Sequence, residues 1–374
     1  MDRIGFRLRA LTLSMSAAAE PLMPARFRAR RGAIGVAAAT LMLLVAMTAS
    51  LAVGPVAIAP GRVLEILLQA AAATLPADAA RDAIVVLDIR LPRTLLGMIV
   101  GAATALAGGV MQGLFRNPLA DPGIVGISSG AALAAASWIV FGAGAAAFLP
   151  PLIAGFGLPL AAFLGGLVMT AILHAIATSG GRTSVLTLLL AGIALGGLTT
   201  AGIGFLVFVA SDQQLREFTF WTMGSLGGAT WPKIGLVLPF VLLLIASAPG
   251  LARALDALSL GEAGAFHVGV DVERLKRLAI VGVAAAVGAS VAVSGVVAFF
   301  GLTVPHLVRL VLGPAHRVLL PVSAIAGAAI LVLADLIART IASPAELPLG
   351  ILTAGVGGPV MLWLLIGRRR VLLG

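Results

Sequence analysis

The sequence contains no cysteine, and charged residues are scarce. Without cysteine the chain can form neither disulfides nor thiolate metal sites, and it has no cysteine nucleophile. Only 11% of the residues are charged, whereas 60% are hydrophobic and the mean hydropathy is +1.12. A soluble domain is about a quarter charged and about half apolar. Water is therefore not the main solvent of this protein.

Motifs for catalysis and for nucleotide binding are also missing. No GxxxxGK[ST] loop occurs, and neither of the two lysines, Lys233 and Lys276, follows a glycine-rich loop. The sequence has no HExxH motif, and its four histidines are scattered, which argues against a membrane enzyme and predicts no metal site. Only Asp335 lies well inside an apolar run, with Arg339 one helical turn later, too little for a proton or sodium relay. Energy for transport should come from a partner.

Long apolar runs rich in Ala, Leu, Val and Gly fill the chain instead. A helix of about 20 residues crosses the hydrocarbon layer and satisfies its own backbone, and the alternation typical of a membrane β-barrel is absent. The 46 glycines would allow such helices to pack closely. We therefore expect an all-α, polytopic membrane protein with about ten transmembrane helices, near residues 33–53, 94–115, 122–142, 150–177, 183–210, 232–250, 275–297, 298–313, 318–341 and 348–367.

Basic residues lie beside these runs and mostly on one side. Residues 1–31 contain seven arginines, and the apolar run that follows is too long for a signal-peptide core. The positive-inside rule then places both termini in the cytoplasm. We expect a basic cytoplasmic tail at 1–31 and one transmembrane domain at 32–370, with a long outside loop at 54–93 that carries its own helix. The charge of +10 is explained by the lipid bilayer, with no nucleic-acid partner.

Four stretches resemble the FecCD-type permeases, which import haem, iron-siderophores and cobalamin. They are RLPRTLLG (90–97) with GGVMQGLFRNPLADPGIVGISSG (108–130), LLLAGIALG (188–196), the run from SLGEAGAFHVGVD (259–271) to GLTVPHLVRLVLGPAHRVLLP (301–321), and ADLIARTIASPAELPLGILTAGVGGPVMLWLL (334–365). The resemblance implies the cobalamin-importer-like (type II importer) fold and a homodimer in the bacterial inner membrane. Its partners would be a periplasmic substrate-binding protein and two copies of a cytoplasmic ATPase that binds the ATP. No cofactor would be bound permanently.

The resemblance also assigns roles at the outer face. Arg90, Arg93 and Arg339 match the arginines with which the family docks its binding protein, and as exposed forks they would pair with carboxylates of that protein. The alternative is that they anchor the span ends at the lipid headgroups.

At the inner face the resemblance assigns a gate and a coupling segment. The gate would consist of two short segments. The first, after the second span, is Asn117, Pro118 and Leu119, and the second, at the start of the fifth span, is Thr183 and Ser184. An ordinary Asn-Pro turn is the alternative for the first segment. Residues 257–273 match the family's coupling helices, which seat in a cleft of the ATPase; the alternative is a solvated, charged loop. The residues assigned to this contact are Leu258, Leu260, Gly261, Phe266 and Val268.

The substrate is the least determined feature. The segment 216–231 looks most like the haem branch of the family, and its apolar groups with one cation would suit haem and its propionates; they are Arg216, Phe218, Phe220, Trp221 and Met223. An aromatic belt at the membrane interface would explain the same residues. Haem leads over ferric siderophore, with cobalamin third. We expect structural or ATPase-facing roles for His306 and His316, and packing roles for His174 and His267.

Overall fold

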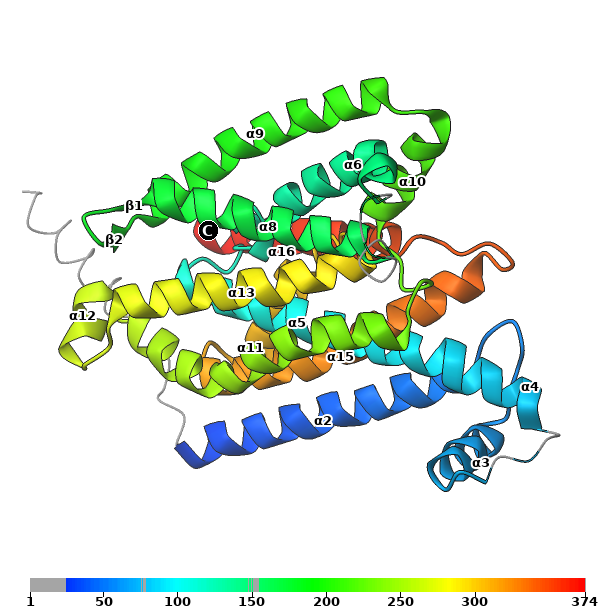
Figure 1. Cartoon of the computed structure of the whole chain (residues 1–374). Coiled ribbons are helices and arrows are strands. Elements are labelled where there is room, and N and C mark those ends of the chain that lie inside the picture. The colour runs from blue at the N-terminus through cyan, green and yellow to red at the C-terminus, as the bar shows by residue number, and fades with distance from the viewer. Residues whose placement is uncertain are drawn as a thin grey trace, which may run out of the picture.

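The computed structural model describes residues 25–373, apart from positions 75, 77–78, 147, 149 and 151–154. Almost all of this part of the chain is helical, and its long helices run side by side in one bundle (Figure 1). The elements are α2 (Ala25–Ala52), α3 (Pro60–Ala71), α4 (Ala80–Ala83), η2 (Ile84–Arg90), α5 (Leu91–Leu114), η3 (Pro122–Val125), α6 (Ile127–Ala146), α8 (Gly157–Ala177), β1 (Thr178–Ser179), β2 (Arg182–Thr183), α9 (Val185–Val209), α10 (Asp212–Met223), α11 (Trp231–Leu258), α12 (Glu262–His267), α13 (Val272–Ser294), α14 (Phe300–Leu312), α15 (His316–Ile341) and α16 (Leu349–Leu373).

The ten expected spans are present among the described residues. Seven helices are long and apolar enough to cross a membrane: α2, the continuous helix Ala80–Leu114, α8, α9, α11, α13 and α15. Three shorter apolar helices complete the set, at Ile127–Gly142, Phe300–Leu312 and Leu349–Leu364. The prediction of an all-α polytopic membrane protein is confirmed.

The second span begins earlier than expected. Residues up to 93 were expected in an outside loop, but α4, η2 and α5 form one helix of 35 residues from Ala80 to Leu114. Charged residues at 81–90 concealed this extension. Pro92 lacks the N–H that an α-helix needs, and the wider turns of the π-helix η2 directly before it accommodate the proline without ending the helix. The expected helix of the loop itself is present as α3.

The core of the bundle is built around α5. This helix packs against α11, α13, α14 and α15. In the continuous helix Ala80–Leu114, 78% of the most apolar stretch is buried inside the chain. Glycines allow the closest approaches: a Cβ on Gly101 would collide with the carbonyl oxygen of Gly327 in α15, and one on Gly108 with that of Gly301 in α14. Small residues therefore bring the central helices into backbone contact, as the glycine content predicts.

Helix α9 lies at the edge of the bundle and is packed far more loosely. It lies beside α6 and α8 (Figure 1). Only 11% of its most apolar stretch is buried inside the chain. Large side chains along it face outward, including Ile193, Leu198, Phe205 and Phe208. Because α9 is apolar all round yet hardly buried within the chain, lipid or another protein must cover it.

The two ends of the bundle carry different elements. The described part of the chain starts and ends at one end, where β1, β2 and α12 also lie, and α3, α4 and α10 lie at the other (Figure 1). We refer to these as the inner and outer ends, following the sidedness expected from the basic residues. Helix α2 begins at Ala25, so residues 25–31 of the expected tail are helical. The rest of that tail lies outside the described residues.

Candidate functional site

The three outer arginines are buried, in contrast to the exposure that the sequence analysis expected. Arg90, Arg93 and Arg339 are 3%, 7% and 6% exposed. Their guanidinium groups donate hydrogen bonds within the chain, so the expectation of free, exposed forks is wrong. Their role in docking a binding protein stays a prediction.

Arg93 joins α5 to α15 and to the loop that follows α15. Its Nε lies 2.9 Å from Oδ2 of Asp335, and its Nη2 lies 2.9 Å from Oδ1 of the same carboxylate. Its Nη1 and Nη2 also donate to Glu346, over 2.7 and 3.0 Å. Asp335 is buried, whereas the Glu346 side chain is 47% exposed at the outer surface. Sequence reasoning missed both pairs because the partners lie 242 and 253 residues from Arg93.

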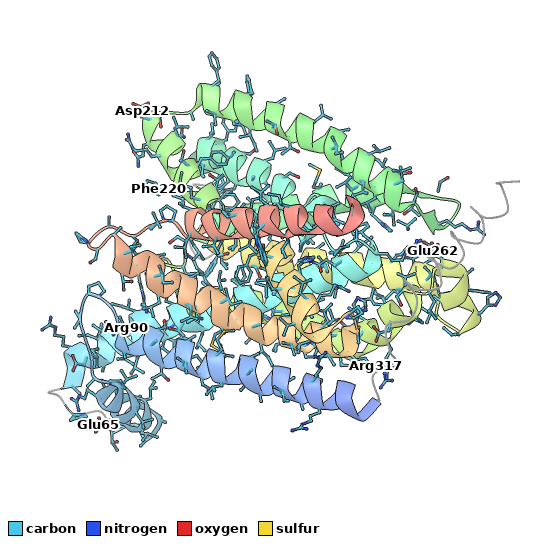
Figure 2. All side chains as sticks on the ribbon, turned by 180° about the vertical axis from the view of Figure 1, so that it is seen from behind. Glu65, Arg90, Asp212, Phe220, Glu262 and Arg317 are labelled. Atoms are coloured by element: carbon cyan, nitrogen blue, oxygen red, sulfur yellow. The ribbon has the colours of Figure 1, made fainter. Side chains whose placement is uncertain are left out.

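Arg90 and Arg339 hold the outer end of α2. Arg90 donates to the carbonyl oxygens of Leu51 and Ala52, over 2.7 and 3.0 Å, and to that of Val56. Arg339 donates to the backbone carbonyl and the hydroxyl of Ser50. The last carbonyls of a helix have no partner inside it, so these arginines supply the missing donors. Figure 2 shows both Arg90 and Glu65 at the outer end of the bundle.

Helix α10 turns one face into the bundle and the other outward. Gln214 donates to two backbone carbonyls of α6, each over 3.1 Å, and the half-buried Phe218 lines a small cavity together with residues of α6 and α9. Trp221 packs against the main hydrophobic core. Arg216 and Phe220, one turn apart on the outward face, are exposed.

The five residues expected to line a pathway therefore fall into two groups. Phe218 and Trp221 anchor α10, whereas Arg216 and Phe220 are available to a ligand. Met223 is half-buried at the end of the helix. Figure 2 shows Asp212 and Phe220 at the outer end of the bundle, together with Arg90. An aromatic side chain beside a cation is thus exposed there.

The expected gate residues lie in two tight loops. Asn117 accepts a hydrogen bond from the backbone N–H of Leu119 over 2.9 Å, which fixes the turn around Pro118, and Leu119 is exposed. The chain then enters η3, which packs against α9 and α13. Ser184 caps the start of α9 by accepting from the N–H of Thr187, while Thr183 is buried. Gating by these residues stays a prediction.

The expected coupling segment presents an apolar surface at the inner end. Leu260, Phe266 and Val268 are 71%, 73% and 62% exposed, and Gly261 has the positive φ that allows the tight turn into α12. Leu258 differs from the other assigned residues because it is buried in the core. The surface available to a partner, named here the α12 patch, therefore consists of Leu260, Phe266 and Val268.

The four histidines lie on four different helices. Among the described residues, no group of three or more His, Asp or Glu side chains could hold a metal ion. His316 is buried, with its Nδ1 2.8 Å from Oδ1 of Asp256, and the same oxygen accepts from its backbone N–H. This contact joins the start of α15 to the end of α11, which is a structural role.

Comparison with known proteins agrees with this architecture. The model of the FecCD transport family matches residues 42–367. The haemin transport system permease protein HmuU of Yersinia pestis is 46% identical over 76% of this chain and 83% of its own length. The cobalamin import system permease protein BtuC of Halobacterium salinarum is also 46% identical, over 76% of this chain and 74% of its own. A vitamin B12 import permease of Salmonella paratyphi A is 39% identical over 92% and 99%.

A solved structure shares the fold as well. It is described as an inward-facing conformation of a metal-chelate type ABC transporter, with a TM-score of 0.76 and 32% identity over 89% of this chain and 98% of that one. The buried outer arginines, the loosely packed α9 and the α12 patch are thus features of a multi-pass membrane permease. The chain belongs to the FecCD transport family.

Proposed function

We propose that this chain carries haem across the bacterial inner membrane as the permease subunit of an ATP-driven importer. Two copies would enclose the pathway, two copies of a cytoplasmic ATPase would drive it, and a periplasmic binding protein would deliver the haem. Both termini would be cytoplasmic. The chain itself holds no nucleotide, in keeping with the missing phosphate-binding loop.

The outward face of α10 is the observation that favours haem. Haem is a flat apolar ring with two propionates, and Phe220 and Arg216 offer an aromatic surface and a cation one helical turn apart. The likeness to a haemin permease points to the same substrate. Cobalamin is the second candidate, supported by one relative of equal identity and by another of lower identity, 39%, that covers more of both chains. Ferric siderophores remain a third substrate of the same family.

Uptake assays with competing cargoes test the substrate. The full complex is reconstituted in liposomes, and uptake of haemin, cyanocobalamin and a ferric siderophore is measured from the cognate binding protein. We expect uptake of haemin, lowered by Arg216→Gln and by Phe220→Ala. Gln213, exposed on the same helix, provides the control Gln213→Ala. Uptake of cyanocobalamin or the siderophore but not of haemin would contradict the proposal.

The exposed flank of α9 supports a homodimer. Its apolar side chains face away from the chain, and α16 likewise carries exposed Trp363 and Ile366. A pathway between two copies would need such surfaces from each of them, because one copy alone buries little of α9. Lipid would cover the rest.

Docking of the binding protein belongs to the outer end. Arg93 already has two carboxylate partners, so an incoming carboxylate would compete with the exposed Glu346. The substitution Glu346→Gln should therefore speed association of the binding protein, and the gain should shrink at high salt because screening acts over about 10 Å at 0.1 M. Association rates that are equal for both forms at low salt would argue against docking through Arg93.

A further inference from the structure

We propose that Lys276 is a positioning residue that ties the α12 patch to the gate loop at Thr183, so that the two move as one body. The inference rests on the proposed function as an ATP-driven importer and concerns how force from the ATPase reaches the gate. Nothing in the sequence marks this lysine, which follows no glycine-rich loop and belongs to no motif.

The ammonium group of Lys276 contacts three separate parts of the inner end. Lys276 is only 3% exposed, and its Nζ lies 2.9 Å from Oε1 of Glu262 in α12. It also lies 2.9 Å from Oε1 of Glu273 and donates to the carbonyl oxygen of Thr183 over 3.0 Å. An ammonium group has three N–H donors, and three acceptors surround this one. The lysine is therefore fully engaged.

The backbone N–H of Thr183 in the gate loop is bound as well. Oε2 of Glu273 accepts the backbone N–H of Thr183 over 2.9 Å, so the carbonyl and the N–H of this residue bind the same ion pair. Thr183 also pairs with Thr178 in the short hairpin of β1 and β2. Its backbone is thus fixed to α13 through Glu273 and Lys276.

This attachment matters because α9, although it contacts α6, α8 and η3, is buried very little within the chain. Thr183 directly precedes Ser184, the residue that caps α9, and α9 is the most loosely packed of the long apolar helices among the described residues. The contact at Thr183 therefore helps to hold the inner end of α9, together with the hydrogen bond from the N–H of Ser184 to the carbonyl of Ala177 and the buried Leu188. Figure 2 shows Glu262 at this inner end of the bundle.

Glu262 provides the link to the ATPase side. It lies in α12, the helix that also carries the exposed Phe266, and its side chain is half exposed. If α12 moved without the gate loop, Lys276 would lose Glu262 while it stayed buried, and an incompletely paired buried charge is costly. Movement of the α12 patch would therefore carry Lys276, and with it Thr183, in the same direction.

The amount of cargo transported per ATP hydrolysed by the assembled complex tests the link between the α12 patch and the gate loop. Glu262→Gln removes the charge on the α12 side, and Lys276→Met removes the whole connection. Lys276→Arg retains a cation with several donors. Arg277→Met is the matched control, because Arg277 is a basic residue on the same helix that is exposed. Cargo uptake and ATP hydrolysis are measured together in liposomes.

We expect Glu262→Gln and Lys276→Met to keep ATP hydrolysis and to lower the cargo moved per ATP by about five- to tenfold, the scale of an ordinary coupling between sites. Lys276→Arg should recover most of the loss, and Arg277→Met should behave as wild type. If Lys276→Met fails to assemble, Glu262→Gln decides, since its side chain is half exposed. Wild-type cargo per ATP in an assembled Glu262→Gln complex would overturn the inference.

A distance measurement separates coupling from plain stabilisation. Because the chain has no cysteine, spin labels can be placed at two exposed positions by Arg182→Cys and Ala263→Cys. The distance between the labels should stay constant when nucleotide binds wild type and should change in Glu262→Gln. A distance that changes in wild type would also overturn the inference. If the wild-type complex hydrolyses ATP but moves no cargo at all, the proposed function itself fails.

Discussion

At the scale of single residues, burial changes the meaning of the outer arginines. Position alone suggested exposed forks, but Arg93 lies between Asp335 and Glu346, and Arg90 and Arg339 bind backbone carbonyls of the first span and the turn after it. A buried guanidinium needs such partners, because its desolvation is otherwise uncompensated. The same three residues therefore fasten α2, α5 and α15 to one another before any partner arrives.

Removing the charge of Arg93 alone should destabilise the chain. Arg93→Gln leaves Asp335 buried without its partner, and breaking a buried pair costs about 3–5 kcal/mol. The double variant with Asp335→Asn should recover much of the loss, because no buried carboxylate then lacks its partner, and Glu346 is half exposed to solvent. Thermal unfolding in detergent measures both, and a single variant as stable as wild type would argue against the pairing.

The loop that carries Glu346 should respond to acid. The hydrogen bonds from Arg93 hold the pKa of Glu346 below its ordinary value of 4.5, which outweighs the effect of partial burial. A lowered carboxyl pKa means that the pairing stabilises the fold above pH 4.5 and is lost as the pH falls through the lowered value. Protection of residues 342–348 from hydrogen exchange, corrected for the intrinsic rate, should stay constant from pH 8 to 5 and fall at lower pH. Glu346→Gln should abolish this step.

At the scale of elements, the sequence predicts the helices better than their contacts. Ten spans follow from apolar runs of about 20 residues, since a lipid environment demands them. The extension of the second span to Ala80 could not be predicted, because charged residues at 81–90 look like a loop. The pairs that Arg93 and Lys276 form also escape prediction, since no local pattern records which distant carboxylate is close in space.

Periodicity could have divided the five residues of α10 in advance. Residues three or four apart share a helix face, so Phe218 and Trp221 belong together, as do Arg216 and Phe220. Which of these faces turns inward depends on α6, whose backbone carbonyls accept hydrogen bonds from Gln214. That choice is made by tertiary packing.

The α12 patch should bind the ATPase through its apolar side chains. Leu260→Asp and Phe266→Asp each place a charge where an apolar contact is expected, and an unpaired carboxylate in an apolar cleft is costly. The ATPase should then be released, or hydrolysis should proceed without uptake. Co-purification of the ATPase together with normal uptake in both variants would place the contact elsewhere.

At the scale of the whole molecule, the purified chain should be a homodimer that does not hydrolyse ATP. The exposed flanks of α9 and α16 favour self-association, and the chain has no phosphate-binding loop. Light scattering corrected for detergent measures the mass, and addition of the ATPase should confer hydrolysis. A stable monomer would contradict the proposed pathway between two copies, and hydrolysis by the permease alone would contradict its dependence on a separate ATPase.

The second transmembrane helix is also longer than the membrane is thick, so its outer end projects beyond the bilayer. Its 35 residues extend about 50 Å at 1.5 Å per residue, whereas the hydrocarbon layer is about 30 Å thick. With its inner end near the cytoplasmic surface, the first turns after Ala80 must stand in water beyond the lipid headgroups. In a chain without cysteine, single thiols introduced one by one from 80 to 100 would serve as a depth gauge. Membrane-impermeant maleimide should label the first of them from outside in intact spheroplasts, and the position where labelling stops would mark the water–lipid boundary.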